Sequence, residues 1–379
     1  MSKKIPVIFF VFIAALAFVY FVGFKKNKLP SEGVTRVTHT PNDSNPYSIN
    51  EQQSLIDSLE IKRILTKKQA YLLGQVIDFR VKDEFIILTQ QSKDQPIIVL
   101  NKKTGAPLKL KTRLGRGPGE FIAARDILEN EKLHQFTVYD PRNSRLTTFE
   151  IIDKKVEVAR ILSIPSSNLS DLAWFNGNIY ATGLFFRDIA FKKFTIKNNE
   201  ITEAFSISPP VFNADNLAAE IKIHLNRRSL TQNKQGRIAL AYLYTCQLQL
   251  FKTEGSLVKT VSGPVEIDPV YRVVPDPNES RLHFLRNKNT RFCYTSMAAS
   301  HSLIFVLFSG RSRSEFREAP ARVAAGTVIH VFNWQGEYKG KIALPVEVRI
   351  IRFDEQTNRF YALSDYPAPR IVEFTALEL

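Results

Sequence analysis

A glycine-rich loop is the densest group of residues that could do chemistry in this chain. It reads Gly115-Arg116-Gly117-Pro118-Gly119-Glu120-Phe121. Glycine amides beside Arg116 can cradle an anion, so one interpretation is an anion-binding loop. Phosphate loops of the familiar kind lead into a helix, however, and no helical pattern follows here. The other interpretation is structural, because Gly117 and Gly119 allow unusual backbone angles and Pro118 stiffens the bend.

A turn some twenty residues later belongs with this loop. It reads Asp140-Pro141-Arg142-Asn143-Ser144-Arg145-Leu146. Asp140 and Asn143 can hydrogen-bond to nearby backbone amides and close a tight turn. Phe121 could then fill the space between adjacent structural repeats. We therefore favour a structural role for Gly115, Gly117, Pro118, Gly119, Glu120, Phe121, Asp140, Asn143 and Arg145.

Catalytic and metal-binding patterns give no comparable signal. The six histidines, His39, His134, His224, His283, His301 and His330, show neither HxH nor HExxH spacing. A zinc site would need three of them to converge from separate repeats. The nearest match to a hydrolase nucleophile turn, residues 310–314, lacks the second glycine. We expect no catalytic residue, metal or cofactor, and we favour a binding protein over an enzyme.

Charge gives a second candidate for function. Lysine and arginine outnumber aspartate and glutamate by 52 to 37, a net charge of +15. Residues 102–116, 221–253 and 281–314 contain basic but no acidic side chains. We expect Arg227, Arg228 and Arg291 near innermost strands. With Arg116 they would bind an anionic glycan, a lipid head group or an acidic envelope protein. The alternative is a solvated basic face.

The elements that must position these residues are strands. From about residue 56, apolar β-type runs recur in pairs that begin near residues 84, 135, 178, 237, 303 and 359, each pair with turn residues beside it. Six units at roughly 45–65 residues are typical of propeller blades. The expected fold is therefore all-β, a six-bladed β-propeller of four-stranded sheets. Residues 59–65 would supply the missing outer strand of the last blade and close the ring.

Three irregular stretches interrupt the blades, at about residues 207–225, 263–289 and 309–326. Prolines mark the first two as loops. Insertions on one face of a repeat protein often form its binding surface.

Two motifs resemble a known family. The run from Gly115 to Phe149 resembles an NHL repeat, and the whole domain is similar to the TolB-like six-bladed β-propellers of bacterial envelope proteins. Those also carry a late hairpin like Val331-Phe332-Asn333-Trp334-Gln335-Gly336. The resemblance implies an exported, anchored binding module. Many members look like lipoproteins, whereas this chain has no cysteine near its N-terminus.

The N-terminus itself predicts a membrane segment. Residues 5–24 carry no charge and are long enough to span a bilayer. We expect a short tail at 1–4, an uncleaved transmembrane signal anchor at 5–24, a flexible linker at 25–55 and the propeller at 56–379. Cleavage as a signal peptide is the alternative. The propeller would lie outside the cytoplasm, on the periplasmic side, and nucleic acid is excluded as a partner.

Two cysteines complete the sequence features. Cys246 and Cys293 each lie in an apolar run, and no CxxC pattern occurs. We expect two buried free thiols. The alternative is one bridge between neighbouring blades.

Overall fold

The computed structural model describes residues 55–65, 73–207 and 228–377, with short gaps at 93, 130, 167, 184–185, 187–188, 268–270, 276–281, 287–288 and 317–319. The expected anchor at residues 5–24 and the linker up to residue 54 lie outside these residues. In the part that the structure describes, no helix is long and apolar enough to cross a membrane.

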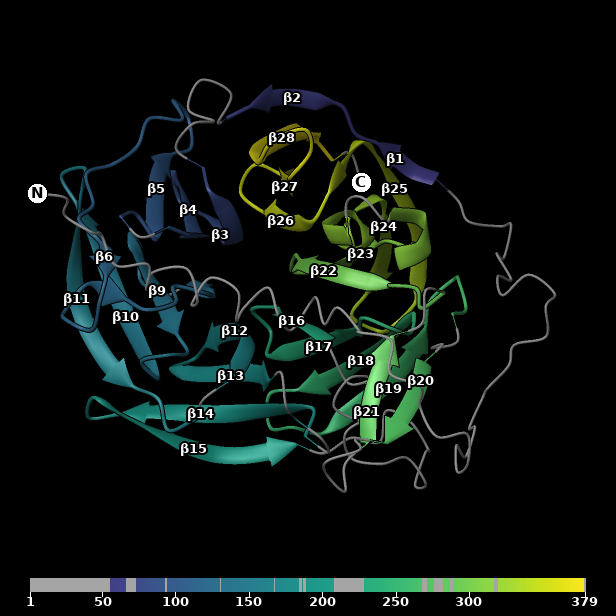
Figure 1. Cartoon of the computed structure of the whole chain (residues 1–379), viewed down its shortest axis with the longest axis horizontal. Helices are drawn as coiled ribbons and strands as arrows, with labels where there is room; N and C mark the ends of the chain where they lie inside the picture. The colour runs from purple at the N-terminus through teal and green to yellow at the C-terminus, as the bar shows by residue number, and fades with distance from the viewer. Residues whose placement is uncertain are drawn as a thin grey trace, which may run out of the picture. The chain divides into compact units, whose positions relative to one another are not determined.

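Six antiparallel sheets stand around a common axis (Figure 1), as the strand pattern predicts. Blade 1 contains β3 (Gln75–Lys82), β4 (Phe85–Gln91) and β5 (Ile97–Asn101). Blade 2 contains β8 (Ile127–Glu129), β9 (Gln135–Asp140), β10 (Arg145–Ile152) and β11 (Lys155–Ser163). Blade 3 contains β12 (Leu169–Phe175), β13 (Asn178–Gly183), β14 (Phe191–Lys197) and β15 (Glu200–Ile207).

The second half of the ring repeats this order. Blade 4 contains β16 (Arg228–Gln232), β17 (Arg237–Tyr242), β18 (Gln247–Lys252) and β19 (Leu257–Ser262). Blade 5 contains β22 (Tyr294–Ala299), β23 (Leu303–Phe308), β24 (Gly326–Asn333) and β25 (Tyr338–Val348). Blade 6 contains β26 (Ile350–Asp354), β27 (Arg359–Ser364) and β28 (Arg370–Ala376). The late hairpin motif is the β24–β25 turn, where Trp334 is buried.

The N-terminal strands close the ring twice. β2 (Ile61–Ile64) pairs antiparallel with β28, which confirms the closing strand expected at residues 59–65. Glu373 of β28, almost fully buried, pairs with Arg63 and Lys62 of β2. The sequence did not reveal a second closure, in which β1 (Leu55–Ser58) pairs in parallel with β25 of blade 5.

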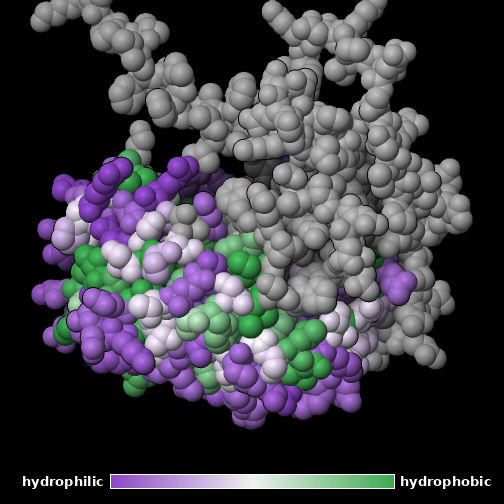
Figure 2. All heavy atoms as spheres, turned by 90° about the horizontal axis from the view of Figure 1, so that it is seen from below, coloured by the Kyte–Doolittle hydropathy of each residue, from purple (hydrophilic) through white to green (hydrophobic). Residues whose placement is uncertain are grey.

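The core consists of apolar layers between neighbouring blades. Successive side chains of a strand point to opposite faces, so one strand serves two layers. In β4, Ile86 and Leu88 pack toward blade 6, whereas Phe85 and Ile87 pack toward blade 2. Phe121 lies in that second layer, between blades 1 and 2. On the side of the molecule in Figure 2, the surface is largely hydrophilic with smaller apolar groups among it.

The two faces of the ring carry different connections. We call the face where the innermost strands begin the top, and the opposite face the bottom. Strand order places the chain that follows the fourth strand of a blade, and the turns between second and third strands, at the top. All three insertions predicted from the sequence therefore leave from and return to the top. The second contains the hairpin β20 (Tyr271–Pro275) and β21 (Leu282–Arg286), and the third contains the 3-10 helices η2 (Arg313–Phe316) and η3 (Pro320–Ala324).

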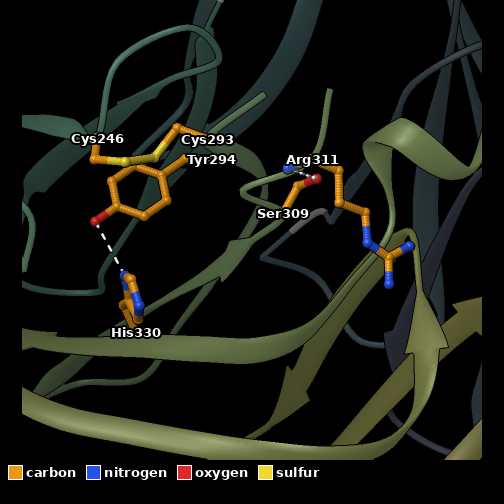
Figure 3. The surroundings of a disulfide bond; sticks show 6 residues. All are labelled: Cys246, Cys293, Tyr294, Ser309, Arg311 and His330. Atoms are coloured by element: carbon orange, nitrogen blue, oxygen red, sulfur yellow. Dashed lines mark hydrogen bonds between the residues drawn. A yellow bond between two sulfur atoms is a disulfide. The ribbon is translucent and has the colours of Figure 1, made fainter. Parts of the chain in front are cut away.

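A disulfide joins blades 4 and 5 at the top (Figure 3). Cys246 lies in the turn between β17 and β18, and Cys293 directly precedes β22, with their Cα atoms 5.4 Å apart. The expectation of two free thiols is therefore wrong, and the alternative of one bridge between neighbouring blades is correct. Both thiols point into the same inter-blade layer, where burial brings their sulfur atoms together.

Two further strands, β6 (Arg113–Leu114) and β7 (Glu120–Phe121), form a small parallel pair that holds the base of the glycine-rich loop.

Candidate functional site

The four arginines proposed for ligand binding do not form one cluster in the part of the chain that the structure describes. Arg227 lies outside the described residues, and of Arg228 only the backbone, at the start of β16, is described. The Arg291 guanidinium donates to the Gly310 carbonyl (2.8 Å) and to Glu315 (2.7 Å). Arg116 is exposed on its loop. Arg116, Arg228 and Arg291 share the top face, but Arg291 is already engaged by a carboxylate.

Internal contacts occupy the glycine-rich loop. The Gly117 amide donates to the Glu120 carboxylate (2.8 Å), so an acidic side chain already takes the place of an anion. This amide, followed by Arg113, holds the pKa of Glu120 below its usual value. Arg145 donates to the carbonyls of Arg116 (3.0 Å) and Gly117 (3.2 Å). The contacts join the loop to the turn at residues 140–146.

Asp140 is the centre of that turn. Its side chain is fully buried and accepts hydrogen bonds from the amides of Ile122 (2.8 Å), Arg142 (3.0 Å) and Asn143 (3.1 Å). The Asn143 side chain donates to the same carboxylate (2.8 Å). Burying a carboxylate is costly without such donors. Asp140 therefore fixes the top corner of blade 2.

A cavity of about 230 Å³ opens at the top of the central channel; we call it the top cavity. Residues from five blades line it: Ile77, Arg125, Asp126, Ser170, Asp171, Gly183, Ser229, Leu243, Tyr294 and Thr295. A site at the ring axis collects side chains that are far apart in the sequence, which no local motif can reveal.

β-Bulges place three of these residues. The pairing of the innermost strands with their neighbours skips one residue in blades 1, 3 and 5, namely Ile77, Asp171 and Thr295. A bulged residue leaves the regular alternation and can be aimed elsewhere. Asp171 also has a φ of 44°, an uncommon conformation for a residue other than glycine. Alternate blades thus each direct one irregular residue to the top cavity.

Two carboxyl groups give the top cavity its chemistry. Burial, followed by the negative charges of Asp171 and Asp78, raises the pKa of Asp126 to about 7. Burial and then the Asp78 charge raise the pKa of Asp171 to about 6. Carboxyl groups that titrate near neutrality can exchange protons or bind a cation. Sequence reasoning missed both. Asp171 lies inside β12, and an aspartate inside a strand, where this residue is depleted, is a usable signal, whereas Asp126 lies just before β8 and gives none.

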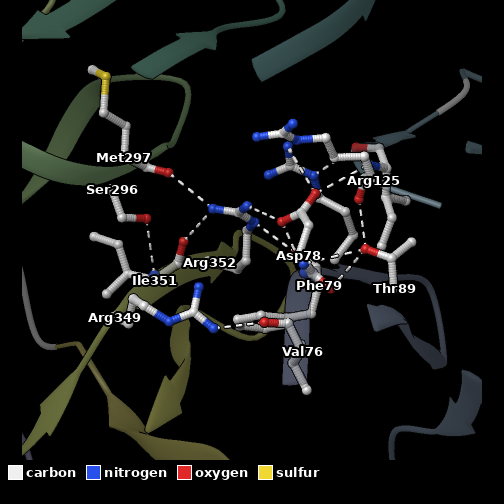
Figure 4. Close-up of polar contacts among 12 residues, drawn as sticks. Val76, Asp78, Phe79, Thr89, Arg125, Ser296, Met297, Arg349, Ile351 and Arg352 are labelled. Carbon is white, nitrogen blue, oxygen red and sulfur yellow. Dashed lines mark hydrogen bonds and ion pairs between the residues drawn. The ribbon is translucent and has the colours of Figure 1, made fainter. Parts of the chain in front are cut away.

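Below the cavity, Asp78 joins four blades at the middle of the channel (Figure 4). Its carboxylate accepts hydrogen bonds from the guanidinium of Arg352 in blade 6 and from the Ile127 amide of blade 2 (3.1 Å). Arg352 in turn donates to the carbonyls of Phe79 (2.8 Å) and of Met297 in blade 5 (3.3 Å). Arg80 lies 3.8 Å from the same carboxylate. The buried arginines outweigh the cost of burial, and the pKa of Asp78 is lowered.

The bottom mouth of the channel is wider and has mixed charge. Its cavity measures about 580 Å³, and both acidic and basic side chains line it. Several are already paired at the bottom, such as Lys102 with Asp354 (2.8 Å) and Lys234 with Glu355 (3.6 Å). This mouth therefore offers no excess of one charge for a ligand to recognise.

The buried histidine His330 is part of the core. His330 is almost fully buried, its ring stacks on Phe308 at 4.7 Å, and its Nδ1 atom meets the Tyr294 hydroxyl at 3.3 Å (Figure 3). Burial lowers the pKa of His330 to about 3, so it remains neutral. Among the described residues, no three His, Cys, Asp or Glu side chains gather to hold a metal ion.

Comparison with known proteins bears on the fold. Residues 109–356 match the family described as TolB-like 6-blade propeller-like. A solved member of the DUF4221 family from Bacteroides vulgatus aligns with a TM-score of 0.52 and 11% identity, over 85% of this chain and 99% of that one. The RRP9 WD40 repeats align with a TM-score of 0.50 and 13% identity, over 85% and 100%. Such low identities show the fold alone. No curated protein matches this sequence significantly.

Proposed function

This chain belongs to the TolB-like 6-blade propeller-like family, and from that premise we propose that it is a binding module that receives its ligand on the top face. The observation that carries the proposal is that all three insertions connect at the top, around the mouth with the top cavity. Loops on a rigid scaffold commonly carry binding residues. The bottom face, in contrast, has short turns.

The proposed ligand is anionic: an envelope glycan, a lipid head group or an acidic envelope protein. Arginine suits carboxylate and phosphate groups because its planar guanidinium donates two parallel hydrogen bonds. Top-face loops of the described chain present Arg116, Arg142, Arg291, Arg311 and Arg322. Arg311 and Arg322 are held by Glu347 and by the Phe316 ring, and these contacts fix the third insertion.

We further propose that the propeller is anchored in a membrane by residues 5–24 and lies outside the cytoplasm. The apolar length of that segment supports the anchor. The disulfide supports the location, because structural disulfides persist in oxidising compartments.

Charge reversal tests the ligand class. The triple variant Arg116→Glu, Arg227→Glu and Arg228→Glu reverses three of the arginines proposed for ligand binding and spares Arg291, which holds Gly310 and Glu315. Its matched control changes three exposed lysines of bottom-face turns: Lys103→Glu, Lys154→Glu and Lys197→Glu. Flotation with anionic vesicles and pull-down with envelope glycans or envelope extract should show at least a tenfold loss for the top variant and little change for the control. Equal binding by both variants would contradict the proposal.

A lyase or hydrolase acting on envelope glycans or peptides is the second candidate function. The observation that favours it is the pair of carboxyl groups with raised pKa in one cavity, a pattern that acid–base catalysts use. Turnover of such a substrate by the wild type, and its loss in Asp171→Asn, would decide for the enzyme.

A further inference from the structure

We propose that the top cavity is a receptor site for a primary ammonium group, held by Asp126, Asp171 and Thr295. This site goes beyond the arginine-bearing loops of the proposed function. It recognises a different charge with different residues, so either proposal can fail without the other.

Unmet hydrogen-bond acceptors carry the proposal. The Oδ2 atom of Asp126 and the Oγ1 atom of Thr295 are shut off from bulk solvent and have no hydrogen-bond partner among the described residues. They come from blades 2 and 5, yet both residues line the top cavity. Buried polar atoms in native proteins are rarely left unpaired, because each costs roughly 1–3 kcal/mol. Both residues line one cavity, so a single ligand that brings donors could satisfy both.

The third acceptor is Asp171 of blade 3. Its bulge and its φ of 44° take it out of the regular strand alternation, and it lines the same cavity. Strained backbone of this kind persists where the surrounding structure enforces it, often at binding sites. An alkylammonium group has three N–H donors. Asp126, Asp171 and Thr295 offer one acceptor group for each.

The charges around the cavity favour a cation. Among the described residues that line it, Arg125 alone is basic. Arg80 and Arg352 contact Asp78 deeper in the channel. The raised pKa of Asp126 and of Asp171 shows that these arginines do not offset the burial of both carboxylates. A bound ammonium would supply the missing positive charge.

Below pH 7, binding should therefore release a proton from Asp126, because the bound cation favours the ionised carboxylate. The charged and titratable groups that face the pair are Asp78 and Arg80 of β3, Arg125 before β8, Glu129 of β8, Tyr139 of β9 and Arg352 of β26. With the pKa of Asp126 at about 7, the ionised fraction makes affinity about 30-fold weaker at pH 5.5 than at pH 8.

The test is calorimetric titration of the full-length protein in detergent micelles, at constant ionic strength. The probes are ethylammonium, tetramethylammonium, which has the same charge but no N–H donor, and propionate. We expect saturable binding of ethylammonium at pH 8 with little proton release, because Asp126 is already about 90% ionised there. At pH 5.5 we expect the 30-fold loss of affinity and the release of about one proton per amine bound. Tetramethylammonium and propionate should bind at least tenfold more weakly.

Three variants complete the test. Asp126→Asn keeps the shape of the side chain and should abolish both binding and proton release, whereas Thr295→Val should weaken binding several-fold. Asp153→Asn, in an exposed bottom turn, is the matched control and should bind as the wild type does. The proposal is overturned if folded wild type binds no ethylammonium, if tetramethylammonium or propionate binds equally well, or if Asp126→Asn retains affinity. The single variant Arg116→Glu, which lies outside the cavity lining, should leave ethylammonium binding unchanged.

Discussion

Replacing Asp126 with asparagine should stabilise this protein at neutral and alkaline pH. The folded-state pKa of Asp126 is about 7, above the ordinary value of 3.8. An acid whose pKa rises on folding contributes its stability below about pH 3.8 and loses it as the pH rises through 7. At 1.36 kcal/mol per pKa unit the loss is about 4 kcal/mol for an isolated group. Because Asp126 interacts with Asp171, we expect about 2–4 kcal/mol.

Thermal unfolding followed by tryptophan fluorescence can measure this effect. Trp174 lies in β12, three residues from Asp171, and reports on the innermost strands. Wild type, Asp126→Asn and the control Asp153→Asn would be compared from pH 4.5 to 8.5. The Tm of Asp126→Asn should rise relative to wild type across this range, by roughly 4–8 °C at pH 8. The control should follow the wild type at every pH.

The opposite result is informative too. If the Tm difference between Asp126→Asn and wild type does not change with pH, Asp126 is ionised throughout and Arg125 must neutralise it. A variant less stable than wild type at pH 8 would show that the carboxylate is a structural partner. Either result would refute the account of the top cavity as a site with excess negative charge.

Two further predictions concern the top face. Cys246→Ser should lower the free energy of unfolding by about 4 kcal/mol, because the bridge joins residues 47 apart in sequence. Reduction of the wild type should lower the Tm by the same amount as this substitution. An unchanged Tm under verified reduction would count against a stabilising role for the disulfide. Asp140→Ala leaves three backbone amides without their acceptor and should lower the free energy of unfolding by about 3 kcal/mol. It should also speed proteolysis within residues 115–121, whereas Asp140→Asn should lose less stability. Equal cleavage rates for wild type and Asp140→Ala would contradict the role of Asp140 in holding this corner.

The fold could be predicted because each blade repeats a local pattern. The middle strands, such as β9 and β10, are apolar runs with turn residues between them, and both signals are local. The closing strand followed from a simple count, since the last unit lacks an outer strand. The second closure by β1 could not be counted in this way, because blade 5 already has four strands of its own.

The site could not be predicted because it depends on distances across the ring. Asp126 and Asp171 line one cavity only because neighbouring blades converge on the axis, and a bulge displaces Asp171 from its expected face. The disulfide was missed for a related reason: apolar surroundings suit free thiols and half-cystines equally, and sequence separation says nothing about the 5.4 Å between the Cα atoms. Basic residues were easier to find in the sequence, but Arg291, which pairs with Glu315, shows that a basic run does not imply an arginine available to a ligand.

The closing strands set the order in which this protein can be completed. The Glu60 amide bonds to Thr375, 315 residues further along the chain. During synthesis β1 and β2 emerge first, whereas their partners β25 and β28 emerge last. Two strand edges therefore stay unpaired for almost the whole of translation, a period in which they can join other chains. Until the ring closes, the nascent chain depends on whatever shields those edges.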